Sequence, residues 1–256
     1  LPDEANLEDY WTVSRAYVEA AINACSSNHE KAIEMADHIR AVVVSGYMKQ
    51  FCEIISSSYC DAEDDIRFEL WTRFKRFVAD CSRETEAEGH ADDSSLRDAS
   101  DAVARLKPQS KCLQSKYWFI YNDFDYRENA DWKASARLLH DRRVSSLEEL
   151  YSSDGWSGFS SLVESNALPD PLGRACASVS FANEIFNRIR YQSAETQYPP
   201  FLKSFYWASG VLLGDSAIDI PKRQHWDDQE IGFFLSCLPY SKAVWDRAET
   251  LPDNIR

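Results

Sequence analysis

Apolar side chains recur at helical spacing through much of this sequence, and this periodicity constrains the fold more than any other feature. The clearest stretch is 64–83. There, one face of a helix would carry Ile66, Leu70, Trp71, Phe74, Phe77, Val78 and Cys81. Asp64 and Asp65 at its start suit the positive end of a helix dipole. The sequence therefore predicts a succession of amphipathic helices.

Residues that make tight turns are scarce. The 256 residues include only 8 glycines and 9 prolines, whereas an all-β domain needs a chain reversal every 8 to 12 residues or so. We predict an all-α fold, a helical-hairpin array of the TPR or HEAT type (an α-solenoid or superhelix), with roughly ten to twelve helices. Residues 41–44 are locally ambiguous, because consecutive valines favour a strand but also fit a buried helix.

Turn and capping signals divide the array. The polar stretch 84–93 predicts a loop between a helix over 64–83 and another that opens at Ser94. Gly155 separates two helical stretches, and Asp170 before Pro171 predicts an N-cap followed by the first helical residue.

The tripeptide Leu-Pro-Asp occurs at 1–3, 168–170 and 251–253, at intervals of 167 and 83 residues. A unit of about 83 residues would hold two helical hairpins, although this tripeptide is also ordinary at helix ends. We expect residues 1–256 to be a single helical-repeat segment of a longer protein. A subdivision near 84–93, into 1–83 and 94–256, is the alternative.

The charge balance narrows the choice of partners. With 28 Lys and Arg against 42 Asp and Glu, the formal net charge is −14. Nucleic acids and anionic membrane surfaces both require a basic face, so neither is expected as a partner. No apolar run approaches the roughly 18 residues of a membrane span, and no signal peptide is evident, so we expect a cytoplasmic protein.

The seven cysteines stand at 25, 52, 60, 81, 112, 176 and 237. Cys25, Cys81 and Cys176 continue apolar helical stripes, which favours small buried hydrophobic residues in a reducing compartment. We assign no disulfides.

Familiar catalytic and cofactor motifs are absent from the sequence. It contains no phosphate-binding P-loop, no GxGxxG, no HExxH, no CxxC pair and no Gly-x-Ser-x-Gly elbow. We therefore predict no catalytic residues, no cofactor and no metal site for this segment.

Two clusters support an enzymatic alternative. Asp123, Asp125, Glu128 and Asp131 could hold a hard cation or share a proton, but the glycine and closing glutamate of a calcium loop are missing. Arg83 and His90 have the Arg-x6-His spacing of helical HEPN-type ribonucleases, although the acidic residues between them would repel RNA. These clusters define the alternative function, a helical metal-dependent hydrolase or HEPN-like ribonuclease.

An aromatic stretch covers 117–126. We favour its packing in a seam between helical hairpins, because so many large apolar groups are costly to expose. In the alternative, it would contact a partner through Trp118, Tyr121, Phe124 and Tyr126.

Four phrases of the sequence form an ordered set. They lie at 69–78 (ELWTRFKRFV), 106–123 (with LKP, YWF and ND), 155–175 (with GWSGFSSLV and PLGRA) and 239–251 (PYSKAVW, then Leu251). As a set, they resemble the helical arrays downstream of the NTPase module in large bacterial STAND-type proteins of the AVAST-like antiviral class. They span about 66 to 256.

The resemblance implies a non-catalytic module for protein recognition or scaffolding within a larger bacterial defence-type NTPase. Nucleotide binding and the effector would reside elsewhere in the parent protein. The expected partners are a protein ligand or other domains of the parent chain, and the parent could also form an oligomer.

Overall fold

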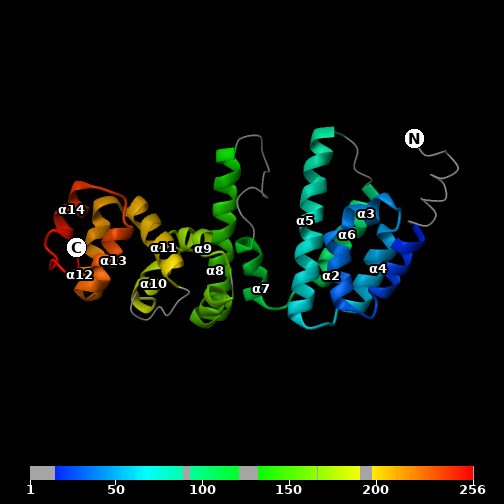
Figure 1. The fold of residues 1–256 in the computed structure, drawn as a ribbon, viewed down its shortest axis with the longest axis horizontal. Helices are drawn as coiled ribbons and strands as arrows, with labels where there is room; N and C mark the ends of the chain where they lie inside the picture. The colour runs from blue at the N-terminus through cyan, green and yellow to red at the C-terminus, as the bar shows by residue number, and fades with distance from the viewer. Residues whose placement is uncertain (1–14, 89–92, 121–131, 166, 191–197, 256) are drawn as a thin grey trace. The chain divides into compact units, whose positions relative to one another are not determined.

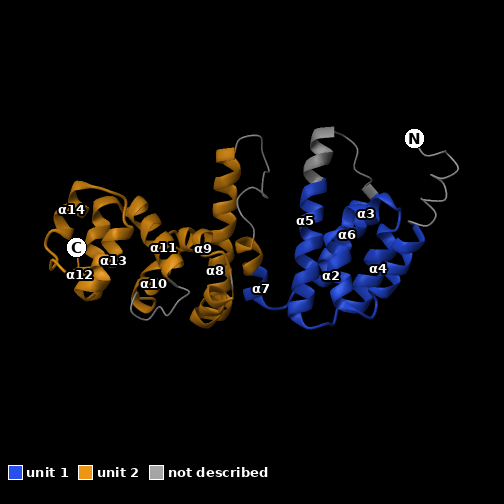
Figure 2. Ribbon diagram, viewed as in Figure 1, with its two compact units in different colours: residues 1–114 blue, residues 115–256 orange. Residues whose placement is uncertain are grey.

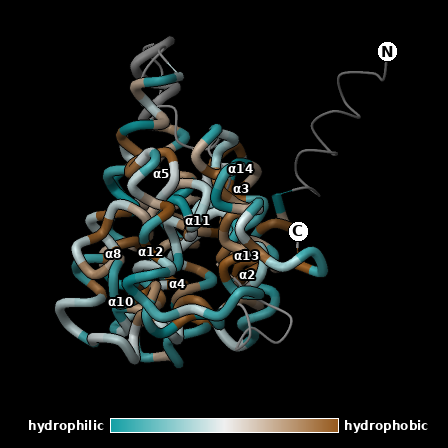
Figure 3. The backbone as a smooth tube through the Cα atoms, turned by 90° about the vertical axis from the view of Figure 1, so that its left-hand side faces the viewer, coloured by the Kyte–Doolittle hydropathy of each residue, from teal (hydrophilic) through white to brown (hydrophobic). Residues whose placement is uncertain are grey.

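The computed structural model describes residues 15–88, 93–120, 132–165, 167–190 and 198–255. A helical stretch at 15–24 precedes thirteen α-helices, α2 to α14, and this part of the chain contains no strand (Figure 1). Hydrophobic and hydrophilic residues are interspersed along the helices (Figure 3), as expected of amphipathic helices. The all-α prediction is therefore confirmed, while the solenoid topology stays a prediction.

The chain divides into two compact units, Leu1–Gln114 and Ser115–Arg256 (Figure 2). The stretch 84–93, considered above as a division, lies inside the first unit. Residues 84–88 belong to α5 (Asp64–Glu88), and Asp93 begins α6 (Asp93–Leu106). These two helices pack against each other. α5 also continues five residues past the predicted end at Arg83, because its last residues, Glu-Thr-Glu-Ala-Glu, are mostly good helix formers.

Unit 1 is built from short helices packed around α5 and α6. α2 (His29–Asp37), α3 (Ile39–Val44) and α4 (Met48–Tyr59) precede them. α2 packs on α5 and α4 packs on α6. The rings of Phe51 and Phe74 stack in its core, with centroids 5.5 Å apart.

The ambiguous stretch 41–44 lies in α3. Val42 is fully buried, whereas Val44 is exposed. Helical geometry lets one valine of the run enter the core while another faces solvent, so the local strand preference is overridden by packing.

Unit 2 contains α8 to α14. Its helices are α8 (Trp132–Glu164), α9 (Pro169–Cys176), α10 (Ala182–Arg188), α11 (Tyr198–Leu213), α12 (Ile220–Gln224), α13 (Asp228–Cys237) and α14 (Lys242–Ala248). Two 3₁₀ helices, η1 (Tyr117–Phe119) and η4 (Gly214–Asp219), complete it, and α7 (Lys111–Lys116) contains the boundary between the units. α11 packs on both α9 and α13.

An aromatic cluster forms the core beneath α11. The ring centroid of Tyr206 lies 4.9 Å from that of Phe234, and the ring centroid of Trp226 lies 5.4 Å from it. The ring centroids of Phe186 and Phe205 are 4.5 Å apart. Aromatic pairs at these distances add to the free energy gained from burial alone, so this cluster fixes the positions of α10, α11 and α13.

Two predicted breaks can be compared with the backbone. Gly155 interrupts α8 with φ 60° and ψ −149°, a conformation that favours glycine, so the predicted separation is confirmed. α9, in contrast, begins at Pro169 with Leu168 as its N-cap. The prediction that Asp170 is the cap is therefore wrong, and Asp170 lies in the first turn with its carboxylate available for other contacts.

None of the helices in the described part of the chain combines the length and apolar character needed to cross a membrane.

Candidate functional site

The aromatic stretch 117–126 is only partly described. Tyr117 and Phe119 are buried in η1, which packs on α8 and α9. Trp118 is half-buried. Its ring meets that of Tyr117 edge-on, and its carbonyl oxygen accepts a hydrogen bond from Arg143 Nε at 2.8 Å. Tyr121, Phe124 and Tyr126 lie outside the described residues, so partner contact through these four residues stays a prediction.

The residues of the enzymatic alternative are mostly outside the described part of the chain. Asp123, Asp125, Glu128, Asp131 and His90 all belong to such segments, while Arg83 lies in α5. Within the described ranges, no group of three or more His, Cys, Asp or Glu side chains is placed to hold a metal ion. All seven cysteines are described, and all are thiols.

One histidine contacts a serine hydroxyl, an arrangement that nucleophilic catalysis could use. His140 Nε2 and Ser178 Oγ are 3.2 Å apart. A catalytic pair also needs a third group that orients the imidazole, and none of the described carboxylates is hydrogen-bonded to His140. We therefore assign this contact to the surface of α8.

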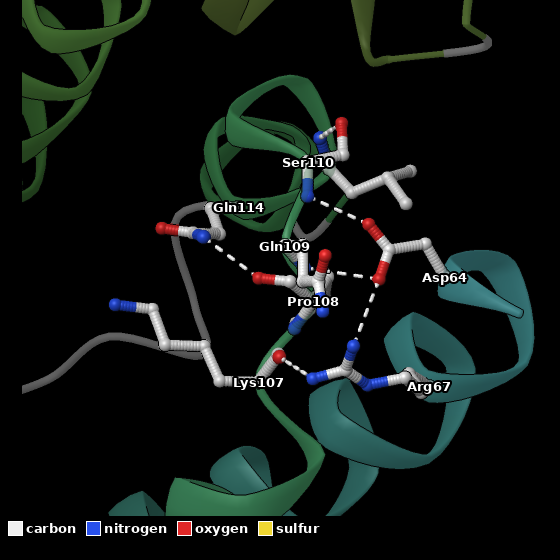
Figure 4. A network of polar contacts seen from close by, with 8 residues as sticks. Asp64, Arg67, Lys107, Pro108, Gln109, Ser110 and Gln114 are labelled. Atoms are coloured by element: carbon white, nitrogen blue, oxygen red, sulfur yellow. Dashed lines mark hydrogen bonds and ion pairs between the residues drawn. The ribbon is translucent and has the colours of Figure 1, made fainter. Parts of the chain in front are cut away.

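A polar cluster in unit 1 joins the start of α5 to the connection between α6 and α7 (Figure 4). The carboxylate of Asp64 accepts hydrogen bonds from the backbone N–H groups of Gln109, at 2.9 Å, and Ser110, at 2.6 Å. Its third donor is Arg67, whose Nη1 is 3.2 Å from Asp64 Oδ1. Arg67 also donates to the backbone oxygen of Lys107.

This cluster is an anchor for a loop. Each carboxylate oxygen of Asp64 meets a backbone donor that no helix would satisfy, and the nearly buried Arg67 guanidinium gains a counter-charge. Figure 4 shows the side chains of Asp64 and Arg67 turned toward the loop at 107–110. The geometry of this cluster therefore accounts for the conformation of the loop at 107–110 and defines no ligand site.

An open cleft of about 480 Å³ lies between α9, α11 and α13 of unit 2. Its volume falls within the range of roughly 300–1,000 Å³ that is typical of ligand sites. The lining residues are Asp170, Arg174, Lys203, Ser204, Trp207, Ser236, Cys237 and Leu238.

Two glycines bring the walls of this cleft together. A Cβ atom at Gly173 would lie 2.5 Å from the carbonyl oxygen of Phe201, so α9 and α11 meet backbone to backbone there. A Cβ atom at Gly210 would lie 2.5 Å from Cδ of Pro239, which follows α13. Lys203 and Trp207 are one helical turn apart on α11, so they present one face of the helix to the cleft.

The charges in the cleft are unevenly compensated. Asp170 forms an ion pair with Arg174 and accepts a hydrogen bond from Ser204 Oγ at 2.5 Å. Lys203 has no carboxylate within ion-pair distance among the residues that the structure describes. The two cations and one carboxylate therefore leave one net positive charge.

The cysteine in the cleft is a poor nucleophile. Burial raises the pKa of the Cys237 thiol, although the hydrogen bond with Ser236 and the charge of Lys203 lower it in part. Since the thiolate is the reactive form, a raised pKa argues against covalent chemistry at this position.

Exposed large apolar side chains gather beside the cleft. Of the ten found in the described residues, six lie between 207 and 245. We define the C-terminal apolar surface as Val211, Leu212, Leu213, Tyr240 and Trp245, with Trp207 shared between this surface and the cleft. The segments that carry these residues are neighbours, because α14 packs on η4 and Ser241 Oγ donates to Asp215 Oδ1 at 3.1 Å.

Sequence reasoning missed both the cleft and the C-terminal apolar surface. The available signal was α11, whose segment 201–213 is apolar around its whole circumference. Such a helix is normally buried on all sides. In unit 2 only part of α11 is covered, and its C-terminal turn is exposed.

Comparisons of the chain with protein families, with curated proteins and with solved structures found no match.

Proposed function

We propose that this chain is a non-catalytic helical module that recognises a protein partner through unit 2. The observation that carries the proposal is the C-terminal apolar surface, where five large apolar side chains are exposed beside an open cleft. Large apolar side chains exposed on neighbouring segments are unfavourable in water and commonly mark an interaction site. The partner is expected to present apolar side chains of its own.

The energetics favour a protein over other partners. Burying one large apolar side chain against a partner gains roughly 1.5–3 kcal/mol, and Trp and Tyr are enriched among the residues that contribute most to binding. Trp207, Tyr240 and Trp245 supply three such side chains. The net charge of −14 argues against nucleic acid, because phosphate binding requires basic surface.

The proposal also covers the larger protein of which this segment would be a part. The phrases at 69–78, 155–175 and 239–251 support a place within a larger, cytoplasmic, bacterial defence-type NTPase of the STAND class. In such a parent, this segment would recognise a ligand or hold other domains in place, while nucleotide chemistry occurs elsewhere. The parent could assemble into an oligomer when the ligand binds.

A site-specific crosslinking experiment tests the proposal. The photo-reactive residue p-benzoylphenylalanine replaces Tyr240, which is 87% exposed on the C-terminal apolar surface. The matched control places it at Tyr17, which is 74% exposed in unit 1. In the source organism, we expect one defined protein to be crosslinked at 240 and not at 17.

The captured protein is then identified, purified and titrated against the chain in a calorimeter. Saturable binding supports the proposal. Equal crosslinking at both positions, or capture of a protein that does not bind in the calorimeter, would contradict it.

A further inference from the structure

The cleft between α9, α11 and α13 carries a chemical preference that the C-terminal apolar surface lacks. We infer that it binds a peptide segment of the partner in which an acidic side chain stands next to an apolar one. This inference rests on the proposed protein-binding function and names the part of the partner that enters the cleft.

The apolar half of the preference comes from Trp207 and Leu238. Trp207 is 48% exposed, so its indole ring is solvated in the free protein although it lines the cleft. Leu238 and Cys237 also line the cleft and are buried. An apolar side chain placed against the indole would remove water from this ring without displacing any protein group.

The acidic half comes from Lys203. Asp170 is already occupied, because one carboxylate oxygen pairs with Arg174 and the other accepts from Ser204. Lys203 is exposed, and no described carboxylate compensates it. Its position one turn before Trp207 places an ammonium group and an indole ring within reach of adjacent residues of one peptide.

The negative net charge of the chain restricts binding of acidic groups to this cleft. A net charge of −14 repels acidic ligands at long range, but salt screens charges beyond a Debye length of about 8 Å at physiological ionic strength. At the short distance of an ion pair, Lys203 dominates. Acidic groups are therefore accepted in this cleft and disfavoured over most of the acidic surface.

Selection from a random heptapeptide library displayed on phage tests the inference with the full chain. The wild-type chain should enrich peptides in which Asp or Glu lies within two positions of a large apolar residue. The Lys203→Glu variant should lose these peptides and enrich basic ones. Lys222→Glu is the matched control, since Lys222 is also exposed in unit 2 but does not line the cleft.

The most enriched acidic peptide is then synthesised with a fluorescent label and titrated by anisotropy. Because a charge-assisted contact is lost, Lys203→Glu should weaken binding by about tenfold to a hundredfold. Trp207→Ala should also weaken binding, and Lys222→Glu should not. Circular dichroism checks that each variant remains folded.

Enrichment without acidic residues, no enrichment at all, or binding that is unchanged in Lys203→Glu would overturn the inference. These outcomes are separate from the proposed function. Crosslinking at 240 reports on the C-terminal apolar surface, so a protein partner could be confirmed there while the peptide preference of the cleft is rejected.

Discussion

Unit 1 and unit 2 both bury aromatic side chains in their cores, but they differ in what they leave at their surfaces. Of the ten large apolar side chains exposed in the described residues, Tyr17 and Val44 belong to unit 1 and the other eight to unit 2. Unit 1 instead has a polar cluster, in which Asp64 and Arg67 hold a loop closed.

This contrast indicates a division of roles. In the described part of unit 1, Asp64 and Arg67 satisfy backbone donors and an acceptor within the unit, and only two large apolar side chains, Tyr17 and Val44, are exposed. In unit 2, the aromatic cluster stabilises α11 from beneath, while the C-terminal turn of α11 stays exposed. A rigid core beneath an exposed apolar surface is the arrangement that allows recognition with little loss of conformational freedom.

The first way to test the contrast is to remove an aromatic ring from the core of unit 2. Phe234 is fully buried against Tyr206 and Trp226. Phe234→Ala should lower the free energy of unfolding by about 3–5 kcal/mol, because it leaves a cavity. Urea unfolding measures the change.

Trp245→Ala is its control. Trp245 is a large aromatic residue of the same unit but is exposed, so the free energy of unfolding should change by less than about 0.5 kcal/mol. Equal losses for the two variants would mean that the surface residue is part of the core.

The second test removes the loop anchor of unit 1. Asp64→Ala deletes the acceptor for Gln109 and Ser110 and leaves Arg67 without its counter-charge. We expect a loss of about 1.5–3 kcal/mol in the free energy of unfolding. Hydrogen exchange followed by mass spectrometry should show faster exchange at 107–110.

Asp65→Ala is matched in residue type and in its place at the start of α5, but Asp65 is exposed. It should leave exchange at 107–110 unchanged. If both variants accelerate exchange equally, the effect comes from the helix dipole and the anchor is refuted.

The third test concerns the backbone contact between α9 and α11. In Gly173→Ala, the new Cβ would meet the backbone of Phe201 and Phe205 at 2.5 and 2.8 Å. Because backbone atoms cannot give way cheaply, we expect a loss of about 1–3 kcal/mol. Thermal unfolding should detect it.

Gly232→Ala is the comparison within the same unit. Its Cβ would meet the Cγ2 methyl group of Ile255 at 2.7 Å. This is a side-chain atom that rotation about the Ile255 Cα–Cβ bond can move, and alanine favours the helix by up to about 1 kcal/mol. Stability should be unchanged or slightly raised. A loss as large as that of Gly173→Ala would show that the close approach is not special.

The smallest expected effect is a pH dependence in unit 1. Burial, with nearby Asp98, Glu53 and Asp101, raises the pKa of Cys52 to about 12. In the unfolded chain, the Cys52 thiol loses its proton above about pH 8.5. The folded chain keeps this proton at that pH, so above about pH 8.5 the folded state binds more protons than the unfolded state. The stability linked to Cys52 is present below that pH and is lost as the pH rises toward 12.

Between pH 9 and 10, this linkage costs about 1 kcal/mol of the free energy of unfolding. Urea unfolding at the two pH values should show a smaller decrease for Cys52→Ala than for the wild-type chain. The same decrease in both proteins would exclude Cys52 as a source.

How much the sequence predicted depends on whether local pattern or tertiary packing decides a feature. The stripe from Ile66 to Cys81 and the scarcity of glycine predicted the all-α fold, because helix periodicity is a local property. Gly155 was recognised as a break for the same reason. The cleft could not be predicted in this way, since it depends on how α9, α11 and α13 meet.

The misplaced features have the same origin. Asp170 has the residue type of an N-cap, but α9 starts at Pro169, and the side chain bonds Arg174 and Ser204 instead. The apolar residues 211–213 have the composition of a core, and only the fold shows that they are exposed. Composition identifies which residues can be buried, whereas packing decides which of them are.

The central claim is that unit 2 binds a protein partner through the C-terminal apolar surface. A calorimetric titration with the partner captured at 240 tests it most directly. The first variant combines three substitutions in one chain, Val211→Ser, Leu212→Ser and Leu213→Ser. The control variant is Val44→Ser, at a position that is 77% exposed in unit 1. Loss of about 2 kcal/mol or more of binding free energy in the triple variant, with full binding by Val44→Ser, is the predicted result. Full binding by the triple variant would contradict the claim.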